Sequence, residues 1–244
     1  MADGPVDGPL LMRARDLNWL QVEEYLSRDD RVVLPVGSTE QHGYLSLETD
    51  NILAERVSAE AAEPLDVLVL PVLAYGLTPS FAAYPGSPTL RLATFLAVLR
   101  DLLDSLQGQG FRRFLLVNGH GGNIAGGSLV REWAAAHPDA QAIFHSWWSS
   151  ERVLAAAKAV DPEPSHANWF ETFPWTRLAG VDLPRERKPP LDHAAYRVAS
   201  PEGVRELLGD GVFAGAYELP DEQVEAVWRA GVEEVRELLE NAWR

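Results

Sequence analysis

Short apolar segments alternate with helical segments through the first part of the chain, and this alternation constrains the fold more than any other feature. Each apolar segment is a continuous run of β-branched or large residues, which is typical of a strand buried on both faces. These segments span residues 32–36, 67–72, 114–117 and 142–144. Strands that alternate with helices predict a mostly parallel sheet flanked by helices on both faces, so we expect an α/β fold.

Three other segments carry a clear helical periodicity. One follows Asp50, and a second spans residues 92–106 and ends near Gly108. The third begins near Asp221, which we expect to act as the N-cap after Pro220. The chain has 244 residues, enough for one sizeable core, and we predict a single domain over residues 1–244.

Composition limits the side chains that can bind a metal and the classes of partner that the protein can have. The chain contains no cysteine, so any metal must be held by His, Asp and Glu side chains. Its formal net charge of -15 repels phosphate backbones and anionic lipids, which argues against nucleic acid and membrane partners. We find no targeting segment and no apolar run long enough for a membrane span, and the absence of disulfides fits a reducing cytoplasm. We therefore expect a cytoplasmic protein with a small-molecule substrate.

Three metal-ligand side chains follow the first predicted strand. Glu40 and His42 are two residues apart, so in an extended segment they project to the same side, and Asp50 can return to them after a turn at Gly43. Carboxylate and imidazole are common ligands of divalent metals, and open α/β sheets place their chemistry at the ends of strands. The alternative is a polar loop with solvated charges.

A glycine-rich loop follows the third predicted strand. Residues 118–123 read Asn-Gly-His-Gly-Gly-Asn, and the glycines let the backbone bend sharply and present His120 at the end of the strand. A phosphate-binding loop is the alternative, but the segment lacks both the Lys-Ser/Thr of a P-loop and the spacing of a dinucleotide site. A third polar cluster, at residues 165–172, adds His166 and Glu171.

These three segments together resemble the creatininase family of metal-dependent amidohydrolases. The family's first motif, G-[AS]-x-E-Q-H-G-P-H-L-P-L-x-T-D, is similar to residues 37–43 followed by 47–50. The second, N-G-H-G-G-N, is matched in full by residues 118–123, and the third, H-A-G-x-x-E-T-S, is matched at His166, Ala167, Glu171 and Thr172. With a similar Tyr-Pro-Gly segment at Tyr84, the resemblance covers most of residues 30–175.

The chain departs from this family pattern at positions that concern the substrate. Creatininase carries a Glu two residues after the histidine of its glycine loop, where this chain has Gly122, and we expect Glu171 to supply the missing carboxylate. Many relatives have a Glu-His pair where this chain has Ser80 and Phe81, and Asn168 and Phe173 replace the usual Gly and Ser of the third motif. Creatinine is therefore a doubtful substrate.

The resemblance implies a site with defined roles. The predicted metal ligands are Glu40, His42, Asp50, His120 and Glu171. They would hold one or two divalent ions (Zn, Mn or Fe), with Asp50 able to bridge two ions and a shared water held as hydroxide. His166 is the predicted proton-transfer residue, with support of a metal ligand as its alternative role. The predicted substrate-binding residues are Trp148, Phe81 and Tyr84.

Three functions remain open. The first is hydrolysis of a C–N amide bond in a small cyclic or heteroaryl amide, the second is processing of a small peptide precursor, and the third is a non-catalytic metal-holding subunit. The resemblance also implies a homo-oligomer, the hexamer of the family, and an interface would explain Trp228 and Trp243 in the last helix. Residues 173–199 show little periodicity and are either a lid, a subunit contact or ordinary loop.

Overall fold

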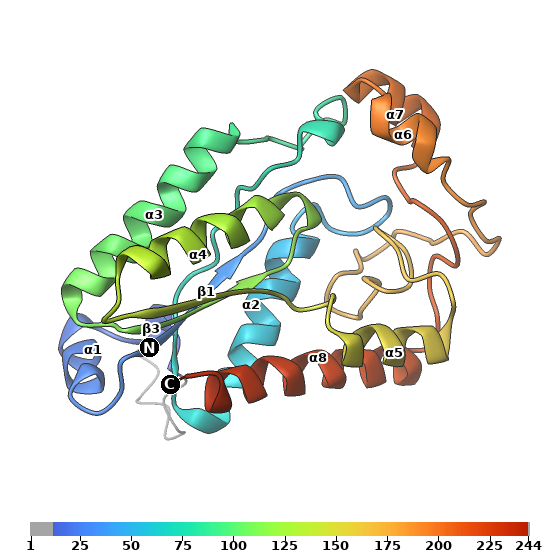
Figure 1. Cartoon of the computed structure of the whole chain (residues 1–244). Coiled ribbons are helices and arrows are strands. Elements are labelled where there is room, and N and C mark those ends of the chain that lie inside the picture. The colour runs from blue at the N-terminus through green and yellow to red at the C-terminus, as the bar shows by residue number, and fades with distance from the viewer. Residues whose placement is uncertain (1–11, 244) are drawn as a thin grey trace, which may run out of the picture.

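Four parallel strands form the central sheet (Figure 1). In this computed structural model, which describes residues 12–243, the strand order is β2-β1-β3-β4. The strands are β1 (Arg31–Val36), β2 (Leu68–Val69), β3 (Arg113–Asn118) and β4 (Gln141–Ser146). The predicted α/β fold with a parallel sheet is thus confirmed. The second strand is much shorter than the predicted run over residues 67–72, because the regular pairing with β1 stops after Val69 and the chain meets β1 again at an isolated bridge between Leu73 and Val36.

Helices cover both faces of this sheet, as the alternation predicts. Figure 1 shows α3 (Leu92–Gln109) and α4 (Ala125–Ala136) on one side, where α1 (Trp19–Leu26) also packs. The other side carries α2 (Thr49–Ala62), α5 (Glu151–Val160) and α8 (Asp221–Asn241). Successive residues of β1 enter opposite cores, since Val32 packs with the α3 side and Val33 with the α2 side.

The remaining elements are short. They are the 3₁₀ turns η1 (Ala14–Asp16), η2 (Glu63–Leu65), η3 (Pro79–Phe81) and η4 (Gly121–Ile124), and the helices α6 (His193–Val198) and α7 (Pro201–Leu208). Sequence periodicity did not indicate α6, which lies within the irregular region 173–199, because a six-residue helix is too short to display a face. Among the described residues, no helix is both long enough and apolar enough to cross a bilayer.

The structure corrects one prediction about the last helix and removes one argument for a subunit interface. The N-cap of α8 is Pro220, and Asp221 is the first helical residue, whose carboxylate accepts a hydrogen bond from Arg177 at 2.6 Å. Trp228 is only 3% exposed in the single chain, because it packs with Trp147 and donates a hydrogen bond from its indole to Glu60 at 2.8 Å. Trp228 therefore gives no argument for a subunit interface.

The register of the sheet brings the two predicted site loops together. Val36 pairs with Asn118, so β1 and β3 end side by side. The loop that follows β1 and the glycine loop that follows β3 therefore start at neighbouring points on the carboxyl edge of the sheet, where α/β proteins place their ligands. The N-terminus of α2 returns to this edge and carries Asp50 as its second residue.

The α3 face gives a test of the core. Phe95 is fully buried, whereas Leu92, one turn earlier on the same helix, is 53% exposed. We expect Phe95→Ala to lower the free energy of unfolding by about 3 to 5 kcal/mol, because it removes a buried ring and leaves a cavity. The control Leu92→Ala should change it by less than about 0.5 kcal/mol. Urea unfolding followed by circular dichroism measures both, and equal values would contradict this packing.

Candidate metal centre and substrate cavity

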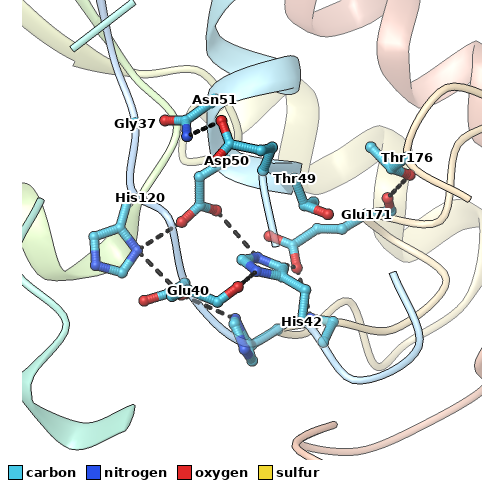
Figure 2. A network of polar contacts seen from close by, with 12 residues as sticks. Gly37, Glu40, His42, Thr49, Asp50, Asn51, His120, Glu171 and Thr176 are labelled. Carbon is cyan, nitrogen blue, oxygen red and sulfur yellow. Dashed lines mark hydrogen bonds and ion pairs between the residues drawn. The ribbon is translucent and has the colours of Figure 1, made fainter. Parts of the chain in front are cut away.

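The five predicted metal ligands meet in one buried cluster (Figure 2). Glu40 and His42 come from the loop after β1, and Asp50 from the first turn of α2. His120 is the residue before η4, and Glu171 lies in the turns that follow α5. Four segments that are distant in the sequence therefore contribute to one site.

Asp50 stands between two sets of ligands. One of its oxygens lies 3.1 Å from Nε2 of His42, and the other lies 2.9 Å from Nδ1 of His120. His120 Nδ1 is also 3.3 Å from Glu40 Oε1, and His42 Nε2 is 3.6 Å from Glu171 Oε2. In each set, Glu40 with Asp50 and His120, and Glu171 with Asp50 and His42, the ligand atoms lie within 4.8 Å of one another. Each set could hold one divalent ion, and Asp50 would then contribute one oxygen to each.

Both histidines use their outer nitrogen for a backbone carbonyl. His120 Nε2 is 2.8 Å from the Leu77 carbonyl oxygen, and His42 Nδ1 is 3.3 Å from that of Glu40. When such a ring is neutral, donation to the carbonyl leaves the lone pair on the other nitrogen, which in both residues faces the carboxylates and would be available to a metal ion. Metal-ligating histidines are commonly oriented in this way.

Several polar atoms of the cluster are buried without any hydrogen bond. They are both carboxylate oxygens of Glu40 and, apart from the ion-pair contacts of Asp50 with His42 and His120 given above, Nε2 of His42 and Oδ2 of Asp50. Glu40 is completely buried, and a buried carboxylate without donors is strongly destabilising unless it is neutralised. The converging oxygens and nitrogens match the donors that Zn²⁺ and Mn²⁺ accept in proteins, so the residues fit a divalent metal.

The electrostatics of the cluster favour ionised groups of opposite sign. Burial lowers the pKa of His42, but the carboxylates of Asp50 and its neighbours outweigh this and raise it to about 10. Burial likewise opposes the cationic form of His120, yet Asp50 and Glu40 raise its pKa well above the ordinary value. Burial raises the pKa of Asp50, but His42 and His120 hold it below its usual range, whereas burial raises the pKa of Glu171 to about 7.

The glycine loop owes its sequence to close contacts. A Cβ on Gly119 would overlap the backbone oxygen of Asp50, and one on Gly122 would overlap the Leu77 carbonyl oxygen and lie 2.5 Å from His120 Nε2. The Asn118 side chain accepts from the His120 N–H at 3.1 Å and donates to the His120 carbonyl at 2.7 Å. The loop therefore sets the position of the His120 ring against both Asp50 and Leu77.

His166 lies at the edge of the cluster. Its Nδ1 is 3.8 Å from Glu40 Oε1, and its ring stacks on Phe81 with centroids 4.9 Å apart. Burial, together with the nearby His42, lowers its pKa well below the ordinary value, so His166 is neutral at pH 7. The next residue, Ala167, has a positive φ of 60°, and its N–H donates to Glu171 Oε2 at 2.6 Å.

Gln41 holds the other side of the His166 ring. Its side-chain oxygen accepts from the Gly43 N–H, and its amide nitrogen donates to the Gly211 carbonyl, both at 3.1 Å. These two bonds fix the orientation of the amide, whose nitrogen lies 2.9 Å from His166 Nε2. Nδ1 is therefore the ring nitrogen that His166 presents to Glu40.

An aromatic cavity of about 310 Å³ opens onto the cluster, and we call it the catalytic cavity. Phe81 and Trp148, two of the predicted substrate-binding residues, line it together with Phe170, Tyr196 and Phe213. Tyr84 does not line it; its ring packs on the edge of Phe81. A hollow of about 370 Å³ between α2 and Met12 contains none of the predicted ligands.

The sequence did not indicate several of these residues. Phe213 lies in residues 209–215, where no site residue was predicted, whereas Tyr196 lies in residues 173–199, for which a lid was one of the predicted alternatives. Neither segment has a periodicity that points a side chain inward. Gln41 could have been singled out from the sequence, because it stands between the predicted ligands Glu40 and His42. In the structure it is 4% exposed, and buried glutamines usually have hydrogen-bond partners.

Comparison with known proteins agrees with this geometry. The family model for creatininase, described as creatinine amidohydrolase, matches residues 15–239. The chain belongs to the creatininase family. Its fold is that of a solved creatinine amidohydrolase (creatininase), with a TM-score of 0.78 and 25% identity over 95% of this chain and 97% of that one. The predicted family and the predicted amidohydrolase class are confirmed at this level.

Relatives named for different activities have similar sequence identity to this member of the family. Creatinine amidohydrolase of Pseudomonas putida is 31% identical over 176 residues, which are 64% of this chain and 68% of that protein. The mycofactocin precursor peptide peptidase of Mycobacterium ulcerans is also 31% identical, over 202 residues and 77% of each chain. Identity alone therefore does not distinguish a small amide from a peptide as substrate.

The glycine loop provides a matched pair of variants. Gly122→Ala places a methyl group on the Leu77 carbonyl and against His120, whereas a Cβ on Gly121 meets no atom within 4 Å. We expect Gly122→Ala to weaken zinc binding by about tenfold or more, since the His120 ring must move, and Gly121→Ala to leave it unchanged. Competition with a fluorescent chelator measures both affinities. Equal affinities in the two variants would show that the loop does not position His120.

The raised pKa values of His42 and His120 predict proton release when metal binds. The raised pKa values favour the cationic form of both rings in the metal-free protein, so a bound ion should displace protons from them at pH 8, whereas ordinary histidines of pKa about 6.5 would release almost none. The apparent affinity should therefore rise with pH and level off only near the raised pKa values. Calorimetry at pH 8 in two buffers of different ionisation enthalpy counts the protons, and a count near zero would contradict the electrostatics.

Proposed function

We propose that this chain is a two-metal amidohydrolase that cleaves the C–N bond of a small cyclic or heteroaryl amide. The observation that carries the proposal is the position of Asp50, whose two oxygens face two separate ligand sets. Glu40 and His120 complete one set, and His42 and Glu171 complete the other. When bound, the ions supply Lewis acidity that polarises the amide carbonyl and lowers the pKa of a water molecule.

His166 is the proposed proton-transfer residue. Hydrolysis needs a base for the proton of the attacking water and an acid for the leaving nitrogen. His166 is neutral at pH 7, and when its Nε2 donates to the backbone carbonyl oxygen of Gln41, 3.2 Å away, the Nδ1 lone pair beside Glu40 can accept a proton and then deliver it. Gln41 and the Phe81 ring hold the imidazole in place while this happens.

The cavity favours a small, flat substrate. Its volume of about 310 Å³ lies at the lower end of the usual range for ligand sites, and aromatic rings form much of its wall. Trp148 and Phe81 are the proposed substrate contacts, and Tyr84 supports Phe81 from outside. A peptidase is the second candidate, because a peptidase relative matches 77% of the chain.

We further propose that residues 1–244 form a single domain, that the protein assembles as a homohexamer and that it resides in the cytoplasm. The family match over residues 15–239 supports the single domain, and the absence of cysteine fits the cytoplasm.

An exposed tryptophan supports the assembly. Trp19 is 71% exposed on α1, where a subunit interface would cover it, whereas Trp243 is partly buried against the α8 core. Light scattering of the purified chain reports the assembly.

Two variants separate the proposed roles of His120 as a metal ligand and His166 as the proton-transfer residue. His120→Ala removes a proposed metal ligand that shares Asp50 and Glu40, and it should leave the protein with little bound metal. His166→Ala should keep its metal and lose turnover by about 10²-fold or more, because it removes only the proton carrier. Elemental analysis of both purified variants provides the comparison. A metal-free His166→Ala protein would make His166 a ligand and refute the assigned role.

Creatinine hydrolysis tests the substrate assignment. Gly122 has no room for the glutamate that creatininase carries at this point, and Phe81 replaces a polar residue with apolar bulk. We expect creatinine turnover far below about 10 s⁻¹, an ordinary enzymatic rate, beside measurable cleavage of another cyclic or heteroaryl amide. A panel of amides and short peptides, assayed with Zn²⁺ and Mn²⁺, gives the answer. Rapid creatinine turnover, or cleavage of peptides alone, would contradict the proposal.

A further inference from the structure

A second cavity adjoins the catalytic cavity. It has a volume of about 740 Å³, and we call it the side groove; it is formed by residues 77–81 and 89–92 with Ala125, next to η3 and the first residues of α3 and α4. Four residues line both spaces: Phe81, His120, Gly122 and Tyr196. The metal-ligating His120 thus has the catalytic cavity on one side and the side groove on the other.

The two spaces differ in charge. Three carboxylates, Glu40, Asp50 and Glu171, line the catalytic cavity, whereas no carboxylate lines the side groove. Arg91 lines the groove and is the only lysine or arginine that lines either space within residues 12–243. Most arginines of this acidic chain are paired, but no described carboxylate lies within ion-pair distance of Arg91, whose side chain is exposed at the start of α3.

A buried hydroxyl adds a second polar group to the side groove. Thr78 is 3% exposed, lines the groove, and its Oγ1 has no hydrogen-bond partner. The backbone N–H of Thr78 is already bonded to Thr89 Oγ1 at 3.0 Å, so the segment is held in place and only the hydroxyl is left over. An unpaired buried hydroxyl is costly unless a ligand or water satisfies it.

We propose that the side groove binds a part of the substrate that extends beyond the scissile amide, and that it recognises an apolar chain ending in a carboxylate. Arg91 pairs with the carboxylate, Thr78 offers a hydrogen bond, and Leu77, Leu90 and Leu92 contact the chain. This inference rests on the proposed function, and it names the substrate class as an amide that carries an acid-ended side chain.

A substrate that fills both the catalytic cavity and the side groove would contact residues that a smaller substrate cannot reach. The catalytic cavity alone holds a small ring, but its wall at Phe81 and Tyr196 is shared with a larger space whose lining is mainly apolar. A substrate confined to the catalytic cavity would leave Arg91 and Thr78 without a role. A substrate that passes His120 and enters the groove uses both.

Matched hydroxamates test the inference by binding rather than by turnover. A hydroxamate is a metal-binding group, so the monohydroxamates of linear dicarboxylic acids can be compared with alkyl hydroxamates of equal length on zinc-loaded protein. We expect the acid-ended compound to bind about five-fold more tightly at one chain length, the size of an exposed ion pair. The preference should shrink when ionic strength rises from about 0.05 M to about 0.5 M, because salt screens exposed charges.

Two arginine variants locate the preference. Arg91→Gln should abolish it and leave binding of the neutral hydroxamate unchanged. The control Arg131→Gln removes an equally exposed, unpaired guanidinium from α4, outside the side groove, and should keep the full preference. Thr78→Val, which keeps the shape of the side chain, should weaken binding of the acid-ended compound only.

The outcomes distinguish this inference from the proposed function. Equal binding of the two hydroxamates, or a preference that survives Arg91→Gln, overturns the side-groove assignment while the metal site stands. Failure of both hydroxamates to bind zinc-loaded protein also overturns it, because the groove would then not reach the ions. A protein that takes up no zinc refutes the proposed function itself.

Discussion

The carboxylate of Asp50 is the interaction on which the rest of the site depends. It is 2% exposed and lies between two histidines that approach it from different loops, one after β1 and one after β3. The parallel register of these strands places both loops at one edge, and the N-terminus of α2 carries Asp50 into the space between them. The fold therefore places the Asp50 carboxylate between the imidazole rings of His42 and His120.

Burying so many ionisable groups together has a cost that only opposite charge offsets. Glu40 is fully buried with both oxygens free of hydrogen bonds, and Glu171 is uncharged in part at neutral pH because burial raises its pKa to about 7. Divalent cations remove this cost, since they replace the missing donors and favour the ionised carboxylates. Metal uptake and local order at this edge of the sheet are thus linked.

The sequence predicted this centre because its ligands occur in short motifs with a physical reason for each residue. Residues 118–123 show the reason most clearly, because Asn118 braces His120 and Gly122 has space for no side chain. The strands β1 and β3 were predicted for a similar cause, since a run buried on both faces is apolar throughout. Residues that act through one distant contact carried no such pattern. Phe213 and Arg91 are examples, because only the folded chain places one in the catalytic cavity and the other in the side groove.

The most direct test of a bridging Asp50 is anomalous diffraction from crystals of the zinc-loaded protein, recorded on either side of the zinc edge. The account predicts two anomalous peaks in each chain, one beside Glu40 and His120 and the other beside His42 and Glu171, with one oxygen of Asp50 directed at each. A single peak, or two peaks of which one lies away from Asp50, would contradict it.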